Sequence, residues 1–451
     1  MVGPDYIPQE VAVPASWSQS ESPGSESRAK DLANWWTLFN DDALNELVET
    51  AISANPERDL SLARVREARA RYRIAAADKF PSVSAGGTAS ATRSEDFIGN
   101  TQWRDLYDAN IDASWEVDIF GSNRRSVQAA EATTQAREAD YVEVMTTLVA
   151  EVALSYVDFR TLEKRLVLTR ALLDSQEKTF ELARWRAEAG LATERDLEQA
   201  FGDLQVTRVT IPALERDIVQ SLNKLSLLIG ESPGELRIPM VTPAAIPTKS
   251  VKPPIGIPAD ILRQRGDIRA AERNLAAQCA RIGIAEANRY PSFTLGGSIG
   301  YSGTSTAILF APAGLVSSLA SSIVVPVFNA GRLRSGVEVE DAVFDQVAAT
   351  YRSTVLSALK EVEDLLAAYN SAAHRAIMLR QGVTAAKRAH QLTMHEYEAG
   401  LTGVDRVLDA QRTLLSFEEQ YILNEATKTT SIISLYKAMG GGWNAAQAQA
   451  R

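Results

Sequence analysis

Proline is distributed unevenly along this chain, and its distribution limits the folds that the chain can adopt. Seven of the 17 prolines lie between positions 233 and 258, and none lies in 82–211 or in 327–451. Because proline interrupts helix interiors, two proline-free tracts on either side of a proline-rich connector indicate two long helical halves.

The two halves are repeats of each other. Three short motifs return 210 residues later in the chain, namely 80–82 as 290–292, 188–191 as 398–401, and 228–230 as 438–440. A single displacement shared by three landmarks indicates a duplicated domain rather than a short-period solenoid.

Each half is expected to contain one very long helix. Residues 122–189 contain neither glycine nor proline, and residues 332–399 contain no proline. At 1.5 Å per residue, each helix would extend for about 100 Å. A compact globule of this chain length would be only about 60 Å across, so the sequence predicts an elongated molecule.

Both predicted long helices carry a heptad-like seam. Apolar and small residues follow alternating steps of four and three, for example Leu148, Val152, Ser155 and Phe159 in the first helix and Val355, Ala358, Val362 and Leu365 in the second. This spacing is typical of left-handed coiled-coil packing. The many small residues favour a helix with several close neighbours, although a plain two-stranded coiled coil would show the same seam.

Gly190 and Gly400 mark the expected ends of the long helices. Each glycine is followed by a shorter helical stretch, 193–229 in the first half and 403–437 in the second. A glycine between two helical runs predicts the turn of an antiparallel helix pair.

A different pattern precedes each long helix. Apolar and polar residues alternate with a period of two over four segments, 82–92, 105–118, 292–302 and 315–327. Their lengths match the roughly 9–11 residues that a tilted strand needs to cross a bilayer. A soluble amphipathic sheet that covers the helices is the alternative interpretation.

Four strands are too few to close a barrel, and open strand edges are not viable in lipid. Several chains would therefore have to contribute strands to one barrel. Two chains would give eight strands and an interior filled by side chains, whereas three would give twelve and leave an aqueous bore. If solutes pass through the barrel, an aqueous bore is needed, which favours the trimer.

Composition excludes several classes of function. The formal net charge is −10, with no long basic block, which argues against nucleic acid as a partner. The chain has one cysteine and three histidines, so it offers little for a metal site, a cofactor or histidine-dependent catalysis. The sequence predicts that the protein is not an enzyme. It contains no apolar run long enough for a transmembrane helix, and its N-terminus has no signal-peptide pattern.

Several local motifs resemble one known family. The sequence resembles the TolC-like outer-membrane factors, especially their lipoprotein (NodT-type) branch, in the motifs at 2–6, 35–39, 115–121, 262–268, 326–332 and 436–443. The resemblance covers essentially the whole chain, and the joint order of these motifs is specific.

The resemblance implies a mainly α fold with a membrane β-barrel portion. Three chains would form a 12-stranded barrel in the outer membrane of a Gram-negative bacterium and a helical tunnel in the periplasm. The partners would be two further copies of the chain, outer-membrane lipid, a periplasmic adaptor, and an inner-membrane transporter of the resistance-nodulation-division class. The duct itself would perform no chemistry, and it would conduct substrates passively out of a tripartite efflux pump.

The expected domain boundaries follow from the repeat and the resemblance. They are an N-terminal tail and equatorial segment at 1–40, a first repeat at 41–230, a proline-rich equatorial connector at 231–258, a second repeat at 259–440, and a C-terminal tail at 441–451.

The sequence departs from the family pattern at two places. Gly266 stands where the family usually has proline. Met1 stands where the lipoprotein branch carries an acylated cysteine, just before Val2. The expectation is that the native protein is made with a leader and a lipid-bearing cysteine.

A gate is expected near the two glycine turns. Asp405, Asp409 and Arg412 are spaced so that they share one helical face, and three copies around an axis would make stacked acidic rings. The resemblance implies that Asp409 lines the closed end. Further candidates for the gate flank the turns, namely Tyr397, Glu398, Glu194 and Asp196. Charges on a solvated helix face are the alternative for all of them except Asp409.

The main alternative function is that of a soluble coiled-coil scaffold or periplasmic adaptor. It would explain the heptads but not four alternating segments of bilayer length.

Overall fold

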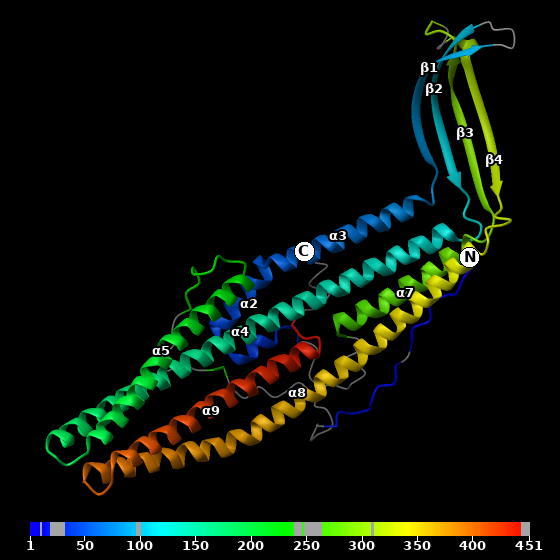
Figure 1. The fold of residues 1–451 in the computed structure, drawn as a ribbon. Helices are drawn as coiled ribbons and strands as arrows, with labels where there is room; N and C mark the ends of the chain where they lie inside the picture. The colour runs from blue at the N-terminus through cyan, green and yellow to red at the C-terminus, as the bar shows by residue number, and fades with distance from the viewer. Residues whose placement is uncertain are drawn as a thin grey trace. The chain divides into compact units, whose positions relative to one another are not determined.

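The structure, a computed structural model, describes residues 1–9, 11–18, 32–95, 101–238, 246–247, 264–307 and 311–442. Figure 1 shows its helices and strands along the chain. Its contacts divide the chain into two compact units. The first unit comprises Met1–Val11, Ala63–Ala139 and Ile268–Thr354, and the second comprises Ala12–Leu62, Asp140–Asp267 and Val355–Arg451.

The first unit contains one antiparallel four-stranded sheet with the strand order β1-β2-β3-β4. Its strands are β1 (Ser82–Glu95), β2 (Thr101–Glu116), β3 (Ser292–Gly303) and β4 (Leu315–Val324). Strands from both halves of the chain meet where β2 pairs with β3, for example at Ile111 opposite Ile299. The two repeats therefore contribute equally to a single sheet.

The two faces of this sheet differ in chemistry. In all three ladders, odd-numbered residues pair with odd-numbered residues, so most of the large apolar side chains of the strands lie on one face. On that face Ile111 is 50% exposed, Ile299 is 53% exposed and Leu319 is 89% exposed. The other face is mainly polar, with Leu106, Val316 and Val324 as exceptions. The edge strands β1 and β4 are exposed along their whole lengths.

The strand boundaries differ from those expected. β1 continues to Glu95 and β2 begins at Thr101, so both extend further than 82–92 and 105–118 at that end of the hairpin. At the other end β2 stops at Glu116, because the Asp118 carboxylate accepts hydrogen bonds from the backbone N–H groups of Gly121 and Arg124 and so forms a turn. β4 stops at Val324 rather than 327, because Pro326 cannot donate to the ladder.

Each half has one helix of 67 residues. These are α4 (Ser122–Glu188) and α8 (Arg332–Glu398), and they belong partly to each unit. The shorter helices that follow them are α5 (Glu194–Leu228), which continues through Pro212, and α9 (Val404–Ala438). Many predicted seam positions are buried, including Val152, Phe159, Val355, Ala358 and Val362. Among the described residues, the search for an apolar helix of membrane-spanning length finds no candidate.

The helices before the sheet are more divided than expected. The first half has two of them, α2 (Asp42–Ala54) and α3 (Pro56–Ala77), with Asn55 between them. The second half has α7 (Gly266–Ala287). Most of the predicted connector at 231–258 and of the C-terminal tail at 441–451 lies outside the described residues.

A compact core in the second unit surrounds a short 3₁₀ helix at Trp35–Phe39. The Trp35 ring is fully buried and stacks on Tyr436 with 5.5 Å between the ring centroids. The backbone N–H of Gly442 donates to the Leu32 carbonyl, 2.8 Å away, and so ties the end of the second repeat to the segment before the first.

Candidate functional site

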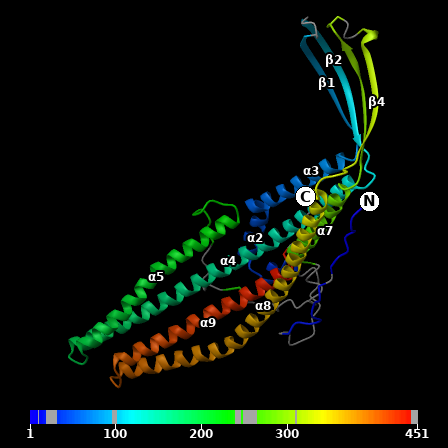
Figure 2. The ribbon, with the colours of Figure 1, turned by 45° about the vertical axis from the view of Figure 1, so that its right-hand side comes forward.

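Two antiparallel helix pairs in the second unit, α4 with α5 and α8 with α9, end in tight turns (Figure 1 and Figure 2). The turns occupy residues 189–193 and 399–403, and their glycines Gly190 and Gly400 have φ values of 73° and 79°. Each turn is closed by a bond from the residue after the glycine, from Leu191 N to Arg186 O and from Leu401 N to Glu396 O, both 2.8 Å. A left-handed glycine with this bond is the Schellman ending of a helix. The two predicted turn glycines are therefore confirmed as helix ends.

Arg186 joins the two hairpin ends. Its guanidinium carbon lies 4.2 Å from the ring centroid of Tyr397. Its Nη2 donates to the carbonyl oxygens of Tyr397 and Glu398, the latter at 3.1 Å. The Tyr397 carbonyl also accepts from the Gly400 N–H at 2.9 Å, so Arg186 adds a second donor to that oxygen and a donor to the Glu398 oxygen. A cation at this position also interacts favourably with the negative end of the helix dipole of α8. Arg186 thus caps a helix of the other repeat.

Tyr397 is the centre of a small core between the hairpins. Its side chain is 2% exposed, and it packs with the buried residues Ala183, Ala200, Val404, Val407 and Leu408. Burial raises the pKa of the phenol above its usual range. In the single chain, Tyr397 is therefore a packed residue that holds the two hairpin ends together.

The two shorter helices begin with different caps. Thr193 Oγ1 accepts from the N–H of Asp196 at 3.3 Å, and the Asp196 carboxylate accepts from the Thr193 N–H at 3.2 Å. These reciprocal bonds form a capping box and hold the pKa of Asp196 below its usual range. The equivalent position in the second repeat is Gly403, which provides no side-chain cap for α9.

The acidic face predicted on the second hairpin is present. Asp405 lies exposed in the first turn of α9, and Asp409 follows one turn later with its side chain 66% exposed. Asp409 Oδ1 lies 3.6 Å from Nη1 of Arg412, as their spacing predicted. Arg412 also reaches α5, where its Nη2 lies 2.6 Å from Oδ1 of Asp203. The bond to Asp203 raises the pKa of Arg412 and fixes its guanidinium between the two repeats.

The remaining candidates lie at the rim of the same region. Glu398 keeps its carboxylate 53% exposed, 3.4 Å from Nδ1 of His395, while its carbonyl binds Arg186. Glu194 is exposed in the first turn of α5. Asp196 has the local capping role described above, and Glu194 and Glu398 leave their carboxylates available to solvent.

Two residues of this region were missed from the sequence. Arg186 is a basic residue four positions before a helix-ending glycine, which is a recognised C-terminal signal. Asp203 carries no such signal, because its partner Arg412 is 209 positions away. Within the part of the chain that the structure describes, no cluster of three or more histidine, cysteine, aspartate or glutamate side chains could hold a metal ion.

Comparison with known proteins identifies the family. The model of a family described as "Outer membrane efflux protein" matches the chain twice, over residues 47–231 and 257–441. The two matches are displaced by 210 residues, so the internal repeat predicted from the sequence is confirmed.

Two relatives cover nearly the whole chain. The toluene efflux pump outer membrane protein TtgC of Pseudomonas putida is 32% identical over 449 residues, which is 98% of this chain and 92% of the relative. Nodulation protein T of Rhizobium leguminosarum bv. viciae is 32% identical over 453 residues, which is 99% of this chain and 91% of the relative.

Among solved structures, the outer-membrane channel OprN superposes with a TM-score of 0.93 at 31% identity, covering 98% of this chain and 99% of that chain. The predicted mainly helical fold with four strands is confirmed, and so is the prediction of a channel rather than an enzyme. The alternative of a soluble scaffold or adaptor is not supported. The chain belongs to the outer membrane efflux protein family and is an outer-membrane channel of an efflux pump.

Proposed function

We propose that the protein is the passive exit duct of a tripartite efflux pump and that three copies form the duct. The observation that carries this proposal is the sheet of the first unit. It has one mainly apolar face with exposed side chains such as Ile111 and Ile299, and one mainly polar face. A sheet of this kind suits a barrel with lipid outside and water inside.

The trimer follows from the edges of that sheet. β1 and β4 each pair with one neighbour and leave a second edge unpaired in the four-strand order. An unpaired edge in lipid costs several kcal/mol for each unsatisfied backbone group, so β4 of one copy is expected to pair with β1 of the next. Three copies would give twelve strands and an aqueous bore.

Native mass spectrometry of the protein extracted in a mild detergent tests this arrangement. The expected species has a mass of three chains, and planar bilayers that contain it should show stepwise ion currents. A monomer that remains folded without detergent and carries no current would contradict the proposal.

The hairpin ends are proposed to close the periplasmic end of the duct. Asp405 and Asp409 would form two acidic rings in a trimer, and each Arg412 would hold its ring to α5 through Asp203. Arg186 would hold the end of α4 to the end of α8 through its contact with Tyr397. Opening would require these contacts between repeats to break.

The partners are proposed from the relatives. TtgC is described as the outer membrane protein of a toluene efflux pump, so this chain is expected to work with other pump components. These would be a periplasmic adaptor that contacts the hairpin ends and an inner-membrane transporter of the resistance-nodulation-division class. Co-purification with the neighbouring gene products, lost after cleavage at the hairpin turns, would support this assignment.

An N-terminal lipid anchor is also proposed. The N–H of Val2 donates to the Phe120 carbonyl at 3.0 Å, and Arg125 donates to the carbonyls of Val2 and Gly3 at 3.3 and 3.1 Å. These bonds place Val2 beside the turn that ends β2, where an acyl chain on a preceding cysteine would reach the membrane. Mass spectrometry of the native protein should show an acylated N-terminal cysteine, and an unmodified N-terminus would refute the anchor.

A further inference from the structure

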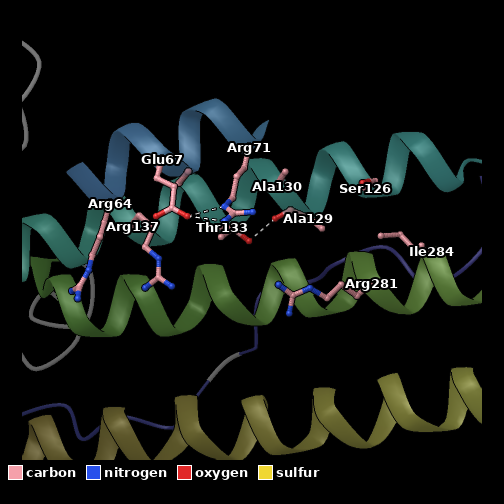
Figure 3. A pocket seen from close by; sticks show the side chains of 11 residues that line it. Arg64, Glu67, Arg71, Ser126, Ala129, Ala130, Thr133, Arg137, Arg281 and Ile284 are labelled. Atoms are coloured by element: carbon pink, nitrogen blue, oxygen red, sulfur yellow. Dashed lines mark hydrogen bonds and ion pairs between the residues drawn. The ribbon is translucent and has the colours of Figure 1, made fainter. Parts of the chain in front are cut away.

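A groove in the first unit is lined by residues of α3, α4 and α7 and has a volume of about 790 Å³. Figure 3 shows arginine side chains entering it from all three helices. They are Arg64 and Arg71 of α3, Arg137 of α4 and Arg281 of α7. All four side chains are exposed to solvent.

The lining of the groove is positively charged. Glu67 is the one carboxylate among the lining residues, and its Oε1 lies 2.8 Å from Nη2 of Arg71. Arg281 uses one N–H to bind the Gln278 amide oxygen at 3.1 Å. A guanidinium group has five N–H donors, so these contacts use only part of the hydrogen-bonding capacity of Arg71 and Arg281. A single carboxylate among four guanidinium groups leaves the lining with a net positive charge.

Small and apolar residues lie between these charges. Ala68, Ala129, Ala130 and Ile284 supply apolar surface, and the Thr133 hydroxyl is occupied by a bond to the Ala129 carbonyl at 2.8 Å. The volume lies within the range of pockets that hold small organic ligands. The groove therefore combines an apolar surface with donors suited to a carboxylate or phosphate.

The groove also lies on a face of α4 that the N-terminal segment leaves open. That segment binds Arg125, which pairs with Asp5 at 2.9 Å. Ser126 and Thr133, which line the groove, are rotated away from Arg125 by about 100° and 80° around the helix, given 3.6 residues per turn. None of the described residues of the N-terminal segment is among those that line the groove.

We propose that this groove binds the anionic group of a small amphiphile, either a carboxylate or a phosphate. The inference rests on the proposed function, because the amphiphile would be either a solute carried by the duct or a lipid of the surrounding membrane. In both cases the guanidinium groups would form charge-assisted hydrogen bonds with the anion, and the apolar part would lie against the alanines and Ile284.

Calorimetric titration of the assembled protein, held in phosphatidylcholine nanodiscs, tests the soluble source. The probe is deoxycholate, with its uncharged methyl ester as the matched ligand. Deoxycholate should bind the wild type, and the variant R64Q/R71Q/R281Q should bind it about tenfold or more weakly. The control R66Q/R73Q/R269Q removes three exposed arginines of α3 and α7 that do not line the groove, and it should bind as the wild type does.

A second arm tests the lipid source. The same three proteins are reconstituted with an equal mixture of phosphatidylcholine and phosphatidylglycerol, and the retained lipid is counted by native mass spectrometry. Retention of phosphatidylglycerol that is lost only in R64Q/R71Q/R281Q would identify a headgroup as the anion.

The proposal is overturned if neither probe binds the wild type, if the groove variant binds as well as the wild type, or if the methyl ester binds equally well. Ion currents of the same preparations separate this failure from failure of the proposed function. A conducting trimer without anion binding would refute the groove alone, whereas a preparation without current would refute the duct.

Discussion

Asn55 and Arg265 occupy equivalent positions, 210 residues apart in the two repeats, and each donates to an equivalent carbonyl. Asn55 Nδ2 lies 2.8 Å from the Leu228 oxygen, and Arg265 Nη1 lies 3.0 Å from the Ala438 oxygen. Each bond joins the end of one shorter helix to the beginning of another helix. The duplicated domain has thus kept the junction while replacing an amide with a guanidinium.

The two junctions are expected to differ in how much they contribute to stability. Arg265 is 8% exposed and also contacts Asp267 at 2.9 Å and Glu361 at 2.7 Å. R265M would leave these partly exposed carboxylates without the guanidinium, and it should lower the free energy of unfolding by about 2–3 kcal/mol. N55A removes one amide and one helix cap, and it should cost about 1–2 kcal/mol. Thermal unfolding followed by circular dichroism compares the two, and an R265M midpoint equal to that of the wild type would contradict the assignment.

Removal of the acidic face should open the proposed gate. D405A/D409A removes both carboxylates of the face and releases Arg412 from Asp409, so single-channel conductance should rise and cation selectivity should fall. The measurement is made in planar bilayers at fixed salt. D174A/D217A, which removes two acids outside the hairpin ends, is the control and should conduct as the wild type does. Equal conductance in all three proteins would show that Asp405 and Asp409 take no part in the gate.

The contact of Arg186 with the second hairpin should depend on the shape of the guanidinium group as well as on its charge. R186K keeps a cation but cannot bind two carbonyls and cover the Tyr397 ring in the same way. We expect faster proteolysis at the 399–403 turn and a higher open probability in bilayers. Y397F keeps the ring and should behave as the wild type, whereas Y397L should resemble R186K. If R186K matched the wild type in both measurements, the contact between the repeats would have no part in closure.

The capping box should give one hairpin a pH dependence. The folded-state pKa of Asp196 is held below its usual range, so its carboxylate stabilises the fold above the unfolded pKa of about 4. That stabilisation is lost as the pH falls through the folded pKa. D196N should therefore cost at most about 0.5 kcal/mol at pH 6, a small amount because solvent screens this carboxylate, and the cost should fall as the pH is lowered through the folded-state pKa. Melting curves at pH 6 and at successively lower pH values test this, with E194Q, an exposed neighbour outside the box, as the matched control.

A charged side chain should reduce the amount of trimer on one face of the sheet and be tolerated on the other. I299R places a guanidinium on the apolar face, where it would cost about 2–4 kcal/mol at the middle of a membrane. S298R places the same group on the polar face, which would face water. We expect I299R to reduce heat-modifiable trimer in outer-membrane fractions and S298R to leave it unchanged. Comparable yields of trimer for both variants would argue against a lipid-facing side.

Local signals in the sequence predicted much of this fold. Gly190 and Gly400 mark the helix ends to within two residues, because a left-handed glycine is a local requirement. The alternating segments predicted all four strands, because alternation reports which face is apolar. The C-terminal end of β2 was less accurate, since it depends on the turn that the Asp118 side chain forms with residues beyond the strand.

The contacts between the repeats were not predictable in the same way. Asp203 and Arg412 are 209 residues apart, and no local sequence pattern around either residue indicates that the other is its partner. Arg186 and Tyr397 likewise meet only because two hairpins lie together in the second unit. The sequence did predict Asp409 beside Arg412, since both belong to one helix.

The unequal caps at Thr193 and Gly403 give the duplicated hairpins different resistance to fraying. The turn between α4 and α5 has the two reciprocal hydrogen bonds of the capping box, whereas the turn between α8 and α9 has no side-chain cap. In a ring of three copies, hairpins with a capped turn and hairpins without one would alternate around the circumference. In the proposed trimer, the three turns between α8 and α9 would therefore fray more readily than the three turns between α4 and α5.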